Sequence, residues 1–262
     1  NNNLDIIYLL LSNPKIEIGP YSFYKCTKLK KVEIPSSIKG IEEATFYNCI
    51  SLTEVNIPST ATYIGQNGFS GCNSLISIVI PSSVTTIKRN AFCFCSSLKS
   101  IIIPPSVTSI DVYCFFSCFN LENVSLPTSL TELKDATFYR CPKMKQITIP
   151  SSIVSIGNDV FYDCSSLTEI SIPSSVTSIG NKSFYQCTSL VNVFIPSTLA
   201  LIGSHAFVGC KSLQKVEFSS SENNETNNSN SFTSKQRIEN SAFYKCSSLV
   251  SVSIPLVMKI VG

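Results

Sequence analysis

Eight prolines stand 23 residues apart along this chain, and this spacing restricts its fold more than any other feature of the sequence. They are Pro35, Pro58, Pro81, Pro104, Pro127, Pro150, Pro173 and Pro196. A fixed period of this length is typical of a solenoid, in which each repeat forms one turn and packs against the next turn. We therefore expect residues 1–262 to form a single array of about ten 23-residue units.

Each unit follows the pattern L-x-x-V-x-I-P-x-S-V-x-x-I-G-x-x-A-F-x-x-C-x-x with few substitutions. The phenylalanine occupies one unbroken column: Phe23, Phe46, Phe69, Phe92, Phe115, Phe138, Phe161, Phe184, Phe207 and Phe243. A unit of this size can bury its phenylalanine and aliphatic residues only against copies of itself. The pattern therefore predicts ten stacked rings in one internal column.

The apolar positions within a unit predict its local structure. Alternation of valine or isoleucine with polar residues before each proline indicates a strand with one buried face, and the proline ends its pairing. The following S-V-x-x-I stretch is predicted to be a second short extended segment, and Gly65, Gly157, Gly180 and Gly203 are expected to adopt a positive φ. Phe, Cys and Leu three residues apart favour a short α- or 3₁₀-helix, which makes the predicted class an α/β repeat solenoid.

Ten of the twelve cysteines also form a column, at Cys26, Cys49, Cys72, Cys95, Cys118, Cys141, Cys164, Cys187, Cys210 and Cys246. Equivalent positions on stacked turns lie about 5 Å apart with parallel side chains, a geometry that does not favour a disulfide. We interpret these residues as buried thiols that act as small apolar side chains. Cys93 and Cys114 lie outside the column and are either free thiols or a disulfide formed in an oxidising compartment.

One insertion interrupts the period, because the step from Phe207 to Phe243 is 36 residues. The extra residues lie in the Asn- and Ser-rich segment 219–235, which has little to bury and is predicted to be a loop. It is either an unselected insertion or a loop that carries glycans or contacts a partner. The asparagines of matching glycosylation sequons are Asn224, Asn227, Asn123 and Asn181.

The repeated spelling I-P-S-S-V-T-S-I-G-x-x-A-F-x-x-C-x-S-L resembles the BspA-like, or Treponema-type, leucine-rich repeats over essentially the whole chain. The resemblance implies a right-handed superhelix with a parallel β-sheet on its concave face and short extended, 3₁₀ or helical segments on the convex side. It also implies protein binding, including adhesion to host cells or matrix proteins, and no enzymatic activity. Members occur on bacterial surfaces and in protists, and the Asn-rich insertion favours a protist surface-protein family.

Little in the sequence indicates catalysis, a cofactor or a metal site. His205 is the single histidine and is interpreted as a surface residue, and Cys93, Cys95, Cys114 and Cys118 have poor spacing for zinc. A net charge of +3 with 14% charged residues favours neither nucleic acid nor an anionic membrane. The longest apolar run, Ile6 to Leu11, is too short to span a membrane.

The candidate binding residues are the strand positions that point away from the core, because they vary on a repetitive frame. We expect them to form a protein-binding concave surface. They are Lys31, Glu33, Glu54, Asn56, Val79, Ile102, Gln146, Glu169, Asn192, Phe194, Lys215 and Glu217. Val79, Ile102 and Phe194 are the apolar members, and exposed apolar residues on neighbouring turns are typical of a binding patch.

Three hypotheses for function follow. The first is an extracellular or cell-surface module that binds a host or matrix protein through the concave face. The second is a cytoplasmic scaffold for signalling partners that uses the same face. The third is self-association, because the chain begins and ends inside a repeat, which suggests a fragment of a longer protein with uncapped terminal turns.

Overall fold

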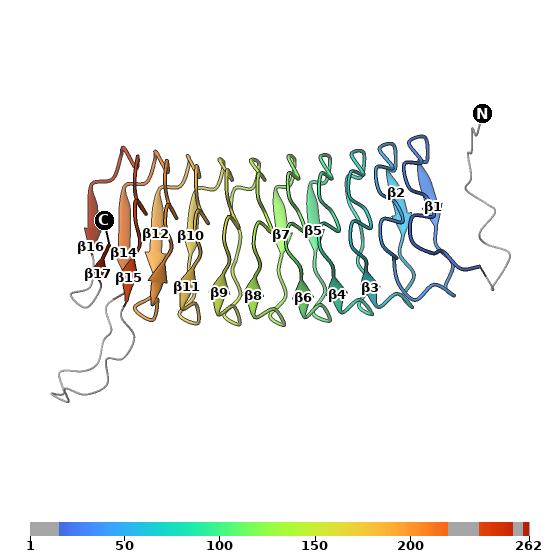
Figure 1. Cartoon of the computed structure of the whole chain (residues 1–262), viewed down its shortest axis with the longest axis horizontal. Helices are drawn as coiled ribbons and strands as arrows, with labels where there is room; N and C mark the ends of the chain where they lie inside the picture. Colours follow the sequence, from blue (N-terminus) through green and yellow to red (C-terminus); the bar gives the residue numbers. More distant parts are fainter. Residues whose placement is uncertain (1–15, 220–235, 254–258, 262) are drawn as a thin grey trace.

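The structure is a computed structural model that describes residues 16–219, 236–253 and 259–261. Within these residues the chain is a parallel-strand β-solenoid of about 9 turns. Figure 1 shows the turns standing side by side along one axis, from the blue N-terminal end to the red C-terminal end. The predicted insertion beyond Ser219, with its sequons at Asn224 and Asn227, and the run Ile6 to Leu11 lie outside the described residues.

The segment before the proline forms a strand in most turns, with the central valine or isoleucine buried in most of them and half-buried at Val124 and Val252. These first strands are β1 (Lys31–Glu33), β2 (Glu54–Asn56), β5 (Ser100–Ile102), β7 (Asn123–Ser125), β10 (Glu169–Ser171), β12 (Asn192–Ile195), β14 (Lys215–Phe218) and β16 (Ser251–Ser253). They pair in parallel as β1-β2, β5-β7 and β10-β12-β14-β16, so this sheet is interrupted. The register step is 23 residues, as in Glu169↔Asn192, and it becomes 36 across the insertion, as in Lys215↔Ser251.

The predicted second extended segment is confirmed and forms two-residue strands. These second strands are β3 (Tyr63–Ile64), β4 (Thr86–Ile87), β6 (Ser109–Ile110), β8 (Glu132–Leu133), β9 (Ser155–Ile156), β11 (Ser178–Ile179), β13 (Leu201–Ile202), β15 (Arg237–Ile238) and β17 (Lys259–Ile260). They pair in parallel as β3-β4-β6 and as β8-β9-β11-β13-β15-β17. Most turns thus contribute two short strands to the solenoid.

The ten phenylalanine rings form the predicted internal column. Consecutive ring centroids lie between 5.0 Å, for Phe184 and Phe207, and 5.7 Å, for Phe138 and Phe161. The rings from Phe46 to Phe207 are fully buried, while Phe23 and Phe243 at the two ends are partly exposed. The offset stacking brings apolar ring faces together in every turn, which confirms the burial assignment.

The cysteine column is buried apart from Cys26 and Cys246. Its thiols do more than fill space, because each of the nine from Cys49 to Cys246 donates a hydrogen bond to the phenylalanine carbonyl of the preceding turn. The Sγ of Cys141, for example, lies 3.3 Å from the Phe115 carbonyl oxygen, and the Sγ of Cys164 lies 3.2 Å from that of Phe138. A small residue with a weak donor therefore satisfies a buried acceptor at every turn.

The helical segments and the α/β class that the spacing predicts are wrong. Across the described residues the Phe-x-x-Cys-x-x-Leu stretch consists of turns, in which Cys49 N–H donates to the Phe46 carbonyl and Leu52 N–H to the Cys49 carbonyl. The residues two positions before and after each phenylalanine are left-handed, as at Ala136 (φ 53°) and Arg140 (φ 56°). A left-handed residue ends a right-handed helix, so the three-residue spacing reflects successive turns instead.

The expected positive φ at Gly65, Gly157, Gly180 and Gly203 is also wrong, since among the described glycines only Gly71 and Gly209 have one. These four glycines lie where the backbone of one turn closely approaches the neighbouring turn. A Cβ on Gly180 would lie 2.5 Å from the carbonyl carbon of Gly157, and one on Gly65 would lie 2.5 Å from the Ile41 carbonyl oxygen. The side chain is missing here because the neighbouring backbone occupies its place.

Candidate functional site

The outward side chains of the first strands, with the equivalent segments Ser77–Val79 and Gln146–Thr148, form one surface, which we call the first-strand face. All twelve candidate residues lie on it; Asn192 and Glu217 are half-buried and the other ten are exposed. The strand register places several of them in adjacent rows, as in Glu169↔Asn192 and Phe194↔Glu217. They extend along most of the array, however, so they form a surface rather than one compact site.

Four charged residues of this face are paired with one another. Lys31 Nζ lies 2.6 Å from a carboxylate oxygen of Glu54 on the next strand, and Lys215 forms an ion pair with Glu217 on its own strand. Exposed ion pairs of this kind contribute little to stability. They do reduce the number of free charges on the face. Among the described residues Glu169 forms no ion pair, so its carboxylate is available to a ligand.

The three apolar candidates are exposed, at 82% for Val79, 73% for Ile102 and 50% for Phe194. Val79 and Ile102 occupy equivalent positions on neighbouring turns, whereas Phe194 lies four turns further along the array. The residues at the equivalent positions between them are Ser125, Thr148 and Ser171. The face therefore has two separated apolar points joined by small polar side chains.

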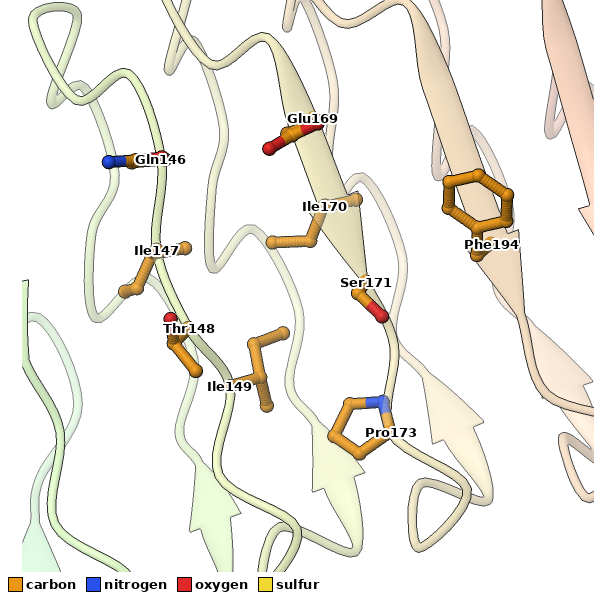
Figure 2. A pocket seen from close by; sticks show the side chains of 9 residues that line it. All are labelled: Gln146, Ile147, Thr148, Ile149, Glu169, Ile170, Ser171, Pro173 and Phe194. Carbon is orange, nitrogen blue, oxygen red and sulfur yellow. The ribbon is translucent and has the colours of Figure 1, made fainter.

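Phe194 stands between two hollows. The first, of about 440 Å³, extends across β10 and is lined by Gln146, Ile147, Thr148, Ile149, Glu169, Ile170, Ser171, Pro173 and Phe194. Figure 2 places Gln146 and Glu169 toward one end of this hollow, Ile149 and Pro173 toward the other, and Phe194 at its side. The second hollow, of about 410 Å³, lies on the other side of the ring and includes Ile195, Pro196, Glu217 and Phe218 in its lining.

The first hollow coincides with an interruption of the first-strand sheet. No backbone hydrogen bond joins Gln146–Ile149 to Glu169–Ile172, although all of these residues are described, and Gln146–Thr148 is not a strand. Ile147, Ile149 and Ile170 form its apolar floor and are 8%, 6% and 2% exposed. Sequence reasoning placed Gln146, Glu169 and Phe194 on this face but missed the isoleucines and Pro173, because in the repeat pattern they are ordinary core and turn positions.

Two of the predicted glycosylation sequons fall within the described residues. Asn123 is exposed on β7, in the middle of the first-strand face. Asn181 is exposed as well, and its Oδ1 accepts a hydrogen bond from the Ser204 backbone N–H at 2.8 Å. Both asparagines therefore lie at the surface, and their modification stays a prediction.

The fully buried thiols are in an environment that opposes nucleophilic chemistry. Burial raises the pKa of Cys164 to about 12 and the pKa of Cys141 well above its usual value, so both remain protonated at neutral pH. Cys93 and Cys114 are both buried free thiols, and burial raises the pKa of each. In the part of the chain that the structure describes, no three histidine, cysteine or acidic side chains are grouped so as to hold a metal ion.

Comparison with known families supplies the decisive observation. The family described as BspA type leucine rich repeat region matches residues 16–145 and 222–262, with 6 copies. The chain belongs to this BspA-type leucine-rich repeat family. The predicted resemblance is thereby confirmed, and with it the leucine-rich repeat fold. The family consists of repeat proteins, and no catalytic family is indicated.

Solved structures of bacterial leucine-rich repeat proteins are similar to this BspA-type chain. A leucine-rich repeat protein from Bacteroides ovatus is 30% identical, with a TM-score of 0.72, over 97% of this chain and 70% of that chain. A leucine rich cell surface protein from Faecalibacterium prausnitzii is 24% identical, with a TM-score of 0.57, over 93% and 82% of the two chains. The pneumococcal vaccine antigen PcpA is 21% identical, with a TM-score of 0.50, over 88% and 73%.

The last two likenesses concern the fold alone. No curated protein matches the BspA-type chain. None of the described residues belongs to a helix long and apolar enough to cross a membrane.

Proposed function

We propose that this BspA-type repeat protein is a non-enzymatic binding module at the cell surface, and that it holds a host or matrix protein on its first-strand face. One observation carries the proposal. The core side of every turn is filled by the same residue types, while the outward positions of the first strands differ from turn to turn and include the exposed residues Val79, Ile102 and Phe194. A constant frame with a variable, partly apolar surface is suited to recognition.

The right-handed curvature and the concave placement of this face, which the family resemblance implies, belong to the same proposal. A concave face would let a folded partner contact several turns at once. The cell-surface location agrees with that of the structurally similar protein from Faecalibacterium prausnitzii, a leucine rich cell surface protein.

The binding proposal is tested with charged substitutions on the two sides of the solenoid. We expect the double variant Val79→Asp/Ile102→Asp, and separately Phe194→Asp, to reduce binding to matrix-coated surfaces at least tenfold, because a charge disfavours burial against a partner. The matched control is Thr85→Asp/Thr108→Asp on exposed positions beside the second strands. If the first-strand variants and the control variant bind equally well, and their melting temperatures are unchanged, the role of the first-strand face is refuted.

An intracellular scaffold is the second candidate, and the cysteines favour it. All twelve are free thiols, whereas disulfides are common in small secreted domains. Labelling of intact cells with a membrane-impermeant reagent separates the two locations. Labelled protein would support the surface module, and labelling only after lysis would support the scaffold.

A further inference from the structure

The first hollow beside Phe194 has the two features that a long basic side chain needs. Its floor of Ile147, Ile149 and Ile170, with the ring of Phe194 at the side, offers apolar surface to an aliphatic stem. Its other end has the exposed carboxylate of Glu169, and Gln146 on the neighbouring turn lies toward the same end (Figure 2). The hollow therefore joins an apolar wall to a single acidic group.

The charge of this hollow is not neutralised by the protein. Glu54 and Glu217 on the same face have lysine partners, whereas Glu169 has no ion pair within the described ranges. A cation bound beside Glu169 would gain a charge-assisted hydrogen bond. A guanidinium or ammonium group near the Phe194 ring would gain a further cation–π attraction.

We propose that this hollow binds an arginine or lysine side chain of the protein partner. The stem of the side chain lies on Ile147, Ile170 and Phe194, and its charged end meets the Glu169 carboxylate. Gln146 lies toward the same end as Glu169, and Thr148 and Ser171 line the hollow further along, beside the stem. The inference rests on the proposed function, because it names the chemistry of the partner that the first-strand face receives.

The test uses N-acetyl-arginine methylamide as the probe and the neutral isostere N-acetyl-citrulline methylamide as its comparison. With isoleucine methyl groups labelled for NMR, we expect saturable shifts at Ile147, Ile149 and Ile170 with the arginine amide. Binding of the citrulline amide should be at least fivefold weaker. Glu169→Gln should abolish this difference, whereas the matched variant Glu33→Gln, an exposed carboxylate at the far end of the same face, should preserve it.

Any of the following results would overturn the proposal: no shifts at these isoleucines, equal binding of the two amides by the native protein, or an unchanged preference in Glu169→Gln. Equal shifts with N-acetyl-norleucine methylamide would likewise show a purely apolar hollow and refute it. These outcomes are independent of the proposed function. If the native protein does not bind the arginine amide, the basic-residue site is refuted. If Val79→Asp/Ile102→Asp still weakens partner binding, the proposed role of the first-strand face stands.

Discussion

At the scale of single residues, each turn depends on one aromatic ring and one thiol. The ring of Phe138 stacks on Phe115 at 5.5 Å and on Phe161 at 5.7 Å, so the contact that buries it is repeated on both sides. The thiol of Cys164 donates to the carbonyl of that same Phe138. Ring and thiol thus act together, since the thiol satisfies a backbone acceptor inside the apolar column.

The buried thiols predict a loss of stability in alkaline solution. Burial raises the pKa of folded Cys164 from its ordinary value of 9.0 to about 12, while the unfolded thiol keeps its ordinary pKa. The stabilising effect is fully present below pH 9 and is lost as the pH rises toward 12, because the unfolded state loses its proton first. At pH 10 the cost is about 1 kcal/mol for each fully buried thiol.

Urea unfolding at pH 7 and at pH 10 measures this effect. Cys164→Ala should reduce the pH-dependent loss in the free energy of unfolding by about 1 kcal/mol, because one alkaline titration is removed. Cys26→Ala changes an exposed thiol and serves as the control, with a much smaller reduction expected. Identical pH dependence in the two variants and the native protein would contradict the assignment.

At the scale of elements, the distance between neighbouring turns of the solenoid depends on glycines at the points where the two backbones are in contact. Gly180 directly follows β11 and lies against the backbone of Gly157 and Asn158 in the preceding turn of the solenoid. The N–H of Gly180 also donates to the Ile156 carbonyl at 2.8 Å. A side chain at this position would therefore separate two neighbouring turns that are hydrogen-bonded to each other.

We expect Gly180→Ala to lower the free energy of unfolding by about 1–3 kcal/mol, since its Cβ would overlap backbone that cannot move independently. Gly19→Ala is the matched control, because a Cβ there meets nothing within 4 Å. Its effect should be below about 0.5 kcal/mol. Urea unfolding of the two variants gives the comparison, and equal losses would show that the contact at Gly180 does not limit the spacing of the turns.

The sequence predicted elements of this size unevenly. The strands before the prolines follow from two-residue alternation, and the second strands were expected as extended segments. The Phe-x-x-Cys-x-x-Leu stretch has apolar residues three positions apart, a spacing that fits both a short helix and successive turns, so the spacing alone predicts the wrong element. Left-handed residues distinguish the two, and Ala136, Arg140 and Lys182 carry no sequence signal for that conformation.

At the scale of the whole molecule, stability is distributed along one axis. Phe138 is fully buried between neighbours on both sides, while Phe23 is only partly buried. In an array of this kind each turn is stabilised by its nearest neighbours, so local opening differs from turn to turn.

Amide hydrogen exchange should reveal this gradient. The Phe138 N–H, which donates to the Val160 carbonyl, is expected to exchange at least tenfold more slowly than the Phe23 N–H, which donates to the Thr45 carbonyl. Both amides donate to a carbonyl of the next turn with a donor–acceptor distance of 2.9 Å, so a difference in exchange rate does not come from the length of the hydrogen bond. Equal protection would indicate that the described turns unfold as one cooperative unit.

The sequence by itself determined the solenoid, the family, the phenylalanine and cysteine columns and the side of the strands that faces outward, because a 23-residue period repeats the same burial problem in every turn. It could not identify the hollow beside Phe194. Ile147 and Ile170 occupy ordinary core positions, and the hollow lies where no backbone hydrogen bond joins Gln146–Ile149 to Glu169–Ile172. Pairing between turns depends on how neighbouring backbones lie relative to each other in space. The paired residues are 23 positions apart in the sequence, so their relative position is set by the tertiary structure.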